Sequence, residues 1–433
     1  MVERLLELAR RQAEAAEVHL EESEARPVQF ENNELKYVHT KSQRAVSLRV
    51  IRGGRIGFAS TTDLAQPERL VARALESARF GQEARFALPS PAPFPQVAVY
   101  DPRVAEFPVE RGIELGREAI ARVLGEFPDV LCGVEVAKWV GRTRLANSSG
   151  LDVQHDATGF DCFLQGLRVR EDGMLWVGEG ESSHALVADF DRYTAKVIAD
   201  IRLAETAAEA PTGAYPVLFT AGAMELLLGL LQLAVNGKFV QKGASPLGGR
   251  LGERVLDERI TLADDATRDF GDGSSPCDAE GTPSRRTVLF DRGVLCRYLC
   301  DLQTAALLGA ETTGNAVRRF ASQPQPDATN LVLDAGQDRF ADLLAGIERG
   351  LFVDAVLGAG QSNVLAGEFS VNVGLGFLVE KGQIVGRVKD CMIAGNVFEV
   401  FNRIRGVGDR AEVHGAMVAP PVCFDAVNVA GAG

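Results

Sequence analysis

Residues 45–60 read AVSLRVIRGGRIGFAS, two apolar runs on either side of Gly53 and Gly54. Glycine readily takes the positive φ that a two-residue hairpin turn requires, so this stretch predicts an antiparallel β-hairpin. Residues 28–40 form another strand-like stretch just before it. Earlier still, residues 2–16 carry apolar side chains at helical spacing and predict an amphipathic first helix. The chain is therefore expected to begin with a helix followed by β-structure.

Helical and strand-like segments continue to alternate irregularly along the chain. The sequence predicts helices at 67–78, 109–127, 191–208, 221–235 and 340–349, and strands within 130–180 and at 215–220. The proline-rich residues 88–95, LPSPAPFP, predict a connector without helix or strand. Because the alternation does not follow strict βαβ units, it favours an α+β architecture over a doubly wound parallel sheet.

The length of 433 residues is enough for two or three domains with substantial cores. The sequence Pro211-Thr212-Gly213 marks the expected boundary. It divides the chain into an α+β N-terminal domain, residues 1–210, and a β-rich C-terminal domain, residues 211–433.

Composition narrows the function classes. The net charge is −13, which argues against sequence-independent binding to nucleic acid, because such binding relies on Lys and Arg. The sequence contains no run of about 18 apolar residues, so it predicts no membrane span. The N-terminal residues also lack the pattern of a secretory signal. The seven cysteines are scattered, which is typical of a reducing compartment. We therefore expect a cytoplasmic protein.

Residues 264–319 carry most of the unusual chemistry. Acidic residues lie there among glycines, serines and prolines, and a pair of arginines follows: Asp264, Asp265, Asp269, Asp272, Asp278, Glu280, Arg285 and Arg286. The stretch is consistent with an oxygen-ligand metal site, a peptide-binding lip or a solvated turn. Its spacing departs from the EF-hand pattern, and Asp is common in turns. The chain has no His-Glu-x-x-His motif, and its five histidines are far apart.

Several motifs in a fixed order resemble one known family. They are LRVIRGGRIGFASTTDL (48–64), RLANSSGLDV (144–153), KGASPLGGRLGE (242–253), CDAEGTPSRRTVLFDRGVL (277–295), TGNAVRR (313–319), TNLVLDAG (329–336) and VAPPVCFDAVNVAG (418–431). Together they resemble the TldD/PmbA family, formerly called modulators of DNA gyrase. The resemblance covers nearly the whole chain. It implies a two-domain fold with an α+β N-terminal part and a C-terminal part built around a curved β-sheet.

The resemblance also implies a place within a peptide-degrading or peptide-maturing system. One branch of the family carries a zinc-binding His-Glu-x-x-x-His helix plus a distant cysteine, and the other lacks it and pairs with the first. Here the two histidine positions fall at Leu228 and Leu233, with Gly229 at the glutamate position. Because leucine cannot ligate zinc, the resemblance implies the branch without zinc, and the zinc cysteine is not carried over to Cys423.

We therefore expect a PmbA/TldE-like non-catalytic subunit, with no cofactor of its own, that joins a zinc-bearing TldD-like paralogue. A homodimer is the expected assembly without that partner. The substrate is expected to be an extended peptide, held by strand addition and by groups near Asp278, Glu280, Arg285, Arg286, Asn315 and Arg318. Two alternatives stay open: a non-hydrolytic peptide-binding modulator of a toxin–antitoxin or gyrase system, and a stand-alone hydrolase with a metal at the acidic loop.

Overall fold

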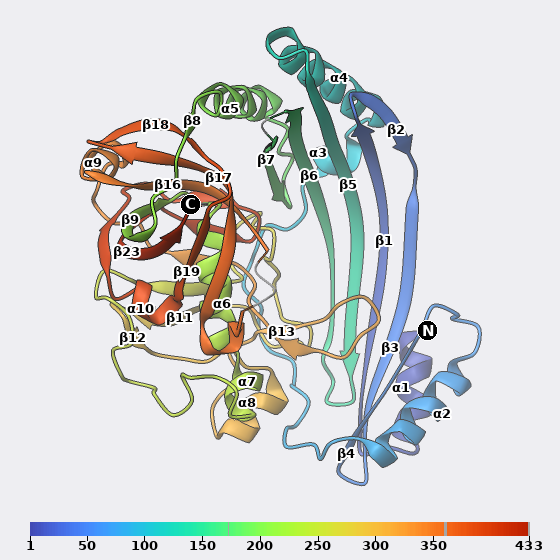
Figure 1. Ribbon diagram of the computed structural model, residues 1–433. Helices are drawn as coiled ribbons and strands as arrows, with labels where there is room; N and C mark the ends of the chain where they lie inside the picture. Colours follow the sequence, from blue (N-terminus) through green and yellow to red (C-terminus); the bar gives the residue numbers. More distant parts are fainter. Residues whose placement is uncertain (172, 359–361, 432–433) are drawn as a thin grey trace.

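The computed structural model describes residues 1–171, 173–358 and 362–431. The first half contains these elements: α1 (Val2–Arg10), β1 (Ala15–Glu31), β2 (Glu34–Val38), β3 (Lys41–Arg52), β4 (Arg55–Thr61), α2 (Pro67–Ser77), α3 (Pro102–Glu106), α4 (Val109–Glu126), β5 (Val130–Asn147), β6 (Asp152–Arg170), β7 (Gly173–Ser183) and α5 (Phe190–Leu203). Its strands form one tall antiparallel sheet in the order β4-β3-β1-β5-β6-β7, with β2 paired to β1 (Figure 1).

Two helical layers cover this sheet at opposite ends. Helices α1 and α2 pack against β1 and β3, and α4 and α5 pack against β5, β6 and β7. The predicted hairpin is confirmed, since Arg52 on β3 pairs with Arg55 on β4 around the two glycines. Both glycines have positive φ, at 59° and 68°, as the tight turn requires.

The second half contains β8 (Ala207–Ala208), β9 (Gly213–Phe219), α6 (Met224–Val235), α7 (Gly237–Gln241), β10 (Leu262–Asp265), β11 (Arg286–Asp291), β12 (Val294–Leu295), α8 (Leu302–Leu308), β13 (Ala316–Val317), β14 (Gln325–Pro326), β15 (Leu331–Leu333), α9 (Phe340–Ala345), β16 (Arg349–Leu357), β17 (Glu368–Glu380), β18 (Gln383–Val388), β19 (Met392–Asn396), α10 (Val397–Val400), β20 (Ile404–Val407), β21 (Glu412–His414), β22 (Met417–Ala419) and β23 (Val422–Ala430). The expected α+β fold and curved C-terminal sheet are confirmed.

Pairing of strands far apart in the sequence closes the C-terminal sheet into a barrel. Its strands run β16-β9-β23-β19-β17, and β16 also pairs with β17, which completes the ring. A second sheet, β12-β11-β10-β15-β22-β21, packs nearby. Helix α6 is apolar on most of its surface and joins the large C-terminal core between these layers. No helix among the described residues is long and apolar enough to cross a membrane.

Four predicted helices are clearly shorter than expected, and one of them, predicted over 221–235, begins only at Met224. The first ends at Arg10, Ala13 lies in the turn that follows, and Ala16 lies in β1, where it is buried against the sheet's helical cover. The helix predicted over 191–208 ends at Leu203, and Ala207–Ala208 pairs with β18 instead. The helix predicted over 340–349 ends at Ala345. The domain boundary near residue 211 stays a prediction.

Candidate functional site

Four of the predicted peptide-binding residues are buried and make contacts within the chain. Asp278 accepts hydrogen bonds from the backbone N–H groups of residues 280, 282 and 316. Glu280, fully buried, pairs with the guanidinium of Arg49 on β3 and accepts from the N–H of Leu302 at 2.8 Å. Asn315 donates to Asp264 at 2.6 Å. The Glu280–Arg49 pair fastens the 264–319 segment to the tall sheet, and the other contacts hold the segment together internally.

Arg318 belongs to the same buried network. Its guanidinium pairs with Glu17 on β1, which in turn lies 2.7 Å from Arg49. Arg285 and Arg286 lie apart from this network. Arg285 donates to the carbonyl of Thr313 at 3.1 Å, and Arg286 pairs with Asp334 at 3.2 Å. The six predicted residues therefore do not converge on one cavity, and their role in binding a peptide stays a prediction.

The acidic loop does not gather its carboxylates. Asp264 is held by Thr329 and Asn315, and burial raises its pKa to about 6. Asp265 bonds to Thr267, and Asp269 accepts from the N–H of Ala98, on the connector to α3. The described residues contain no group of three or more His, Cys, Asp or Glu side chains placed to hold a metal ion.

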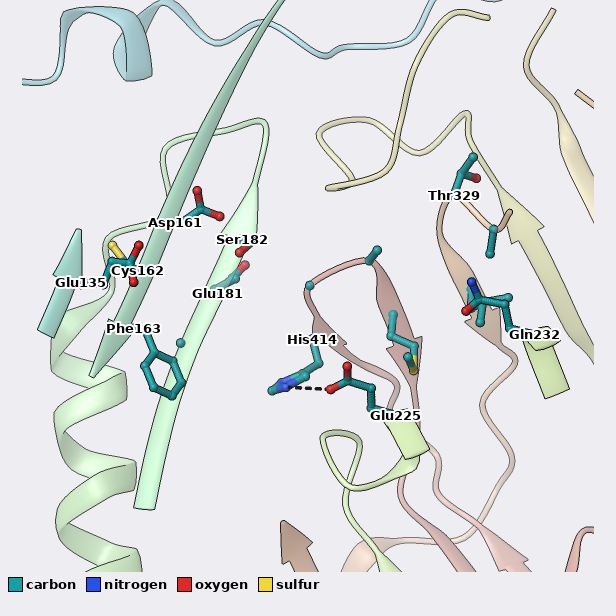
Figure 2. Close-up of a pocket in the computed structure, with 16 residues that line it drawn as sticks. Glu135, Asp161, Cys162, Phe163, Glu181, Ser182, Glu225, Gln232, Thr329 and His414 are labelled. Carbon is teal, nitrogen blue, oxygen red and sulfur yellow. Dashed lines mark ion pairs between the residues drawn. The ribbon is translucent and has the colours of Figure 1, made fainter. Parts of the chain in front are cut away.

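Two cavities lie instead between the tall sheet and the C-terminal half. One is about 610 Å³ and the other about 1130 Å³. Phe163, Glu181, Glu225 and His414 line both, so the two cavities adjoin, and we call them together the cleft. Figure 2 shows Asp161 and Glu181 on the sheet side and Glu225 and His414 on the opposite side. The Glu225 carboxylate lies 4.0 Å from His414 Nε2.

One face of α6 forms part of the cleft wall. Glu225, Gly229 and Leu233 line it, at the four-residue spacing that places side chains on one helical face. A Cβ at Gly229 would meet open space. Leu228, in contrast, is fully buried in the C-terminal core. Of the two positions that the resemblance assigned to zinc histidines, only Leu233 faces the cleft.

These side chains do not fit a zinc ion. Protein zinc sites use cysteine, histidine and carboxylate ligands, whereas α6 offers two leucines and a glycine at the relevant positions. Cys423 is buried on β23 and does not line the cleft. Glu225 is the one carboxylate that α6 contributes to the cleft among the described residues. The cleft can therefore hold a ligand, but α6 does not supply a zinc-bound water.

Charged pairs line the wider part of the cleft. Arg192 on α5 lies 3.0 Å from Glu179 on β7, and Lys196 lies 2.8 Å from Asp354 on β16. Lys196 also contacts Asp200 at 2.6 Å, and burial raises the pKa of Asp200 to about 6. The Lys196–Asp354 pair links the first half of the chain to the barrel across this end of the cleft.

Two strand edges face each other across the cleft. Strand β7 has β6 as its one strand partner among the described residues, and β21 has β22. Residues of both strands line the wider cavity, and their backbones approach each other without pairing. Beside β7 the rings of Phe163 and Trp176 stack, with centroids 6.1 Å apart. An extended chain placed here would find unpaired backbone groups and an aromatic surface.

No pattern in the sequence points directly to this site. Its walls come from β5, β6, β7, α5, α6, β16 and β21, which are far apart in the sequence. Trp176, Gly178 and Gly180 alternate along β7 and mark its inner face, but alternation indicates a strand face and not a site. Only α6 was singled out beforehand, and that came from the resemblance.

Comparison with known proteins places the chain clearly. Residues 212–431 match the family model described as the PmbA/TldA metallopeptidase C-terminal domain, and residues 16–78 match the model for domain 1 of the same metallopeptidases. The C-terminal match alone covers half of the chain. Residues of the C-terminal match form one wall of the cleft, and the other wall comes from β5, β6, β7 and α5, which lie outside both matched ranges.

Individual relatives agree with these models. The chain is similar to the metalloprotease TldD homolog of Haemophilus influenzae, with 36% identity over 48% of this chain and 43% of that one. It is similar to the metalloprotease PmbA of Escherichia coli O157:H7, with 25% identity over 98% and 94% of the two chains. Its fold matches the crystal structure of TldE from Thermococcus kodakarensis, with a TM-score of 0.91, 24% identity and 99% of each chain covered.

Proposed function

Because this chain belongs to the PmbA/TldD metallopeptidase family, we propose that it is the non-catalytic subunit of a two-subunit zinc metalloprotease that acts on unfolded peptides. Its own contribution is to bind the extended peptide in the cleft. The partner that supplies zinc and cleaves the peptide is a TldD-like paralogue. When that partner is absent, the chain forms a homodimer.

The observation that carries this proposal is the contrast between the cleft and its α6 wall. The wider cavity, about 1130 Å³, is large enough for several residues of an extended peptide. Yet Gly229 and Leu233 stand on its α6 wall, where a hydrolase of this family would need a base and a zinc ligand. A cleft that accommodates a peptide without these groups fits a binding role.

Strand addition is the proposed mode of binding. The free edges of β7 and β21 present unpaired N–H and C=O groups to the cleft. Main-chain hydrogen bonds to such an edge do not depend on the side chains of the bound segment. This accounts for a preference for unfolded segments, since folded proteins already use their backbone groups internally.

Side chains along the cleft add weaker selectivity. The stacked Phe163 and Trp176 offer apolar surface to one face of a bound strand. Asp161 lies on the same face of the sheet, whereas Glu179 and Glu181 lie on the opposite face of β7, line the cleft at its edge and pair with Arg192. Burial raises the pKa of Glu179. This combination favours peptides with apolar residues and few acidic ones.

Peptide binding by the isolated chain tests the proposal. We expect an unstructured, fluorophore-labelled peptide of about ten residues to bind, as measured by fluorescence polarisation. The same peptide with alternate backbone amides N-methylated should bind at least about tenfold more weakly, because two or more main-chain hydrogen bonds are lost.

Controls separate the cleft from the rest of the surface. Glu181→Lys should change binding, whereas Glu253→Lys, on an exposed loop outside the cleft, should not. Equal affinity for the methylated and unmethylated peptides would contradict strand addition as the mode of binding. Failure of any extended peptide to bind, alone or with the TldD-like paralogue, would overturn the proposed role.

A further inference from the structure

A smaller cavity of about 210 Å³ lies between the tall sheet and the 264–319 segment. We call it the junction cavity. On the sheet it is lined by two rows of cross-strand neighbours from β1, β5 and β6: His19, Leu145 and Val153, and Glu21, Thr143 and His155. Because strand side chains alternate, all six lie on one face. Asp278, Ser284 and Arg318 lie on the opposite wall.

Several polar groups in this cavity have no partner. His19 and Ser284 are 5% and 6% exposed, and neither His19 Nδ1 nor Ser284 Oγ has a hydrogen-bond partner among the described residues. The same holds for His155 Nδ1. The nearest carboxylate oxygen to His19 Nδ1 belongs to Glu21, at 3.9 Å, too far for a hydrogen bond. Leaving a buried polar group without a partner is unfavourable, so this concentration of such groups points to a ligand.

The charges around the cavity favour a cation. Arg318 is the guanidinium that lines it, and Glu17 neutralises that charge. The Glu21 carboxylate lines the cavity and accepts one long hydrogen bond, from the N–H of Ala321 at 3.3 Å. Burial lowers the pKa of both His19 and His155, so each imidazole is neutral and keeps one acceptor nitrogen. The cavity therefore offers the Glu21 carboxylate, an acceptor nitrogen on each imidazole and the Ser284 hydroxyl oxygen as acceptors, beside the donors that the imidazoles and the hydroxyl also carry.

We propose that the junction cavity binds a primary ammonium group, with the Glu21 carboxylate as its counter-ion and the neutral imidazoles and Ser284 as hydrogen-bond acceptors. An ammonium carries three donors and no acceptor, which matches this set. A cavity of 210 Å³ equals the liquid volume of about seven waters, so it admits an amine of amino-acid size. The amine belongs either to a small free molecule or to the amino end of a peptide. This proposal does not depend on the proposed protease role.

Calorimetric titration of the full chain tests it. Leucinamide is the probe with a free amine, and N-acetyl-leucinamide is the matched probe without one. Leucinamide should bind, and acetylation should weaken binding at least about tenfold, because the charge and the donors are lost. A tripeptide amide with a free amino end distinguishes the two sources. If the tripeptide amide binds more tightly than leucinamide, the site is assigned to a peptide terminus. If it binds more weakly, the site is assigned to a small free amine.

Variants locate the site. Glu21→Gln keeps the shape of the side chain and should weaken leucinamide binding by about tenfold or more. Glu24→Gln, on the same strand but outside the cavity, should leave binding unchanged. The comparison of the two probes on the unchanged chain stands even if a variant folds poorly. Absence of leucinamide binding, equal binding of the acetylated probe, or full binding by a folded Glu21→Gln chain would overturn the proposal.

Discussion

Replacing Leu228 and Leu233 one at a time by alanine should have very different effects on stability. Leu228 is fully buried in the C-terminal core, whereas Leu233 is partly exposed and lines the cleft. Leu228→Ala removes three buried carbon groups, worth about 0.8 kcal/mol each, and leaves a void that raises the cost to about 3–4 kcal/mol. Leu233→Ala only widens an existing cavity, so we expect about 1 kcal/mol or less.

Urea unfolding followed by circular dichroism measures both effects. With an m value of about 3 kcal/mol per molar urea, Leu228→Ala should lower the midpoint of the C-terminal transition by about 1 M. Leu233→Ala should lower it by about 0.3 M or less. Similar shifts for the two variants would refute the orientation of α6, and with it the conclusion that position 228 faces the core.

Three further predictions concern other parts of the chain. Glu280→Gln removes one carboxylate partner of the buried Arg49 guanidinium and should lower the free energy of unfolding in urea by about 3–5 kcal/mol. A decrease of less than about 1 kcal/mol would contradict the importance of this buried network. Burial raises the pKa of Asp200 from 3.8 to about 6, so its protonation stabilises the folded chain below pH 3.8, and this contribution is lost as pH rises through 6. Asp200→Asn should therefore gain stability relative to the unchanged chain between about pH 4 and 7, and a pH-independent difference in urea midpoint would count against this. Gly229→Ala should stabilise α6 by about 0.5–1 kcal/mol, because the added methyl meets open space. The same change at Gly116 on α4 should destabilise, because the methyl would lie 2.4 Å from the Phe30 ring; equal thermal shifts of the two variants would contradict both placements.

Local patterns predicted much of the fold. The Gly53-Gly54 turn and the helix beginning at Pro67 are present, because both depend on residues close in sequence. The first helix ends at Arg10 and α5 ends at Leu203, and in both cases the sequence predicts a later end. Nothing in the local sequence distinguishes a short apolar strand from the last turn of a helix. Closure of the barrel could not be predicted from the sequence. It depends on β16 pairing with both β9 and β17, and no local pattern indicates which strands pair.

The candidate site was harder to predict than the fold. The acidic residues of the 264–319 segment were consistent with a metal site, a peptide-binding lip or a solvated turn, yet Asp264 and Glu280 are buried, and Glu280 pairs with Arg49 of the tall sheet. Charge in a glycine-rich stretch does not reveal whether a carboxylate meets water or a distant arginine such as Arg49. The cleft is likewise built by tertiary packing, and only α6 carried a sequence clue to its location.

We propose that this chain binds peptide but relies on a zinc-bearing partner for cleavage. The most direct measurement is zinc content and cleavage of an unfolded peptide, made on the purified chain alone and on the chain co-purified with its TldD-like paralogue. We predict no stoichiometric zinc and no cleavage for the chain alone, and one zinc per heterodimer with cleavage for the pair. Stoichiometric zinc together with cleavage by the chain alone would contradict the account.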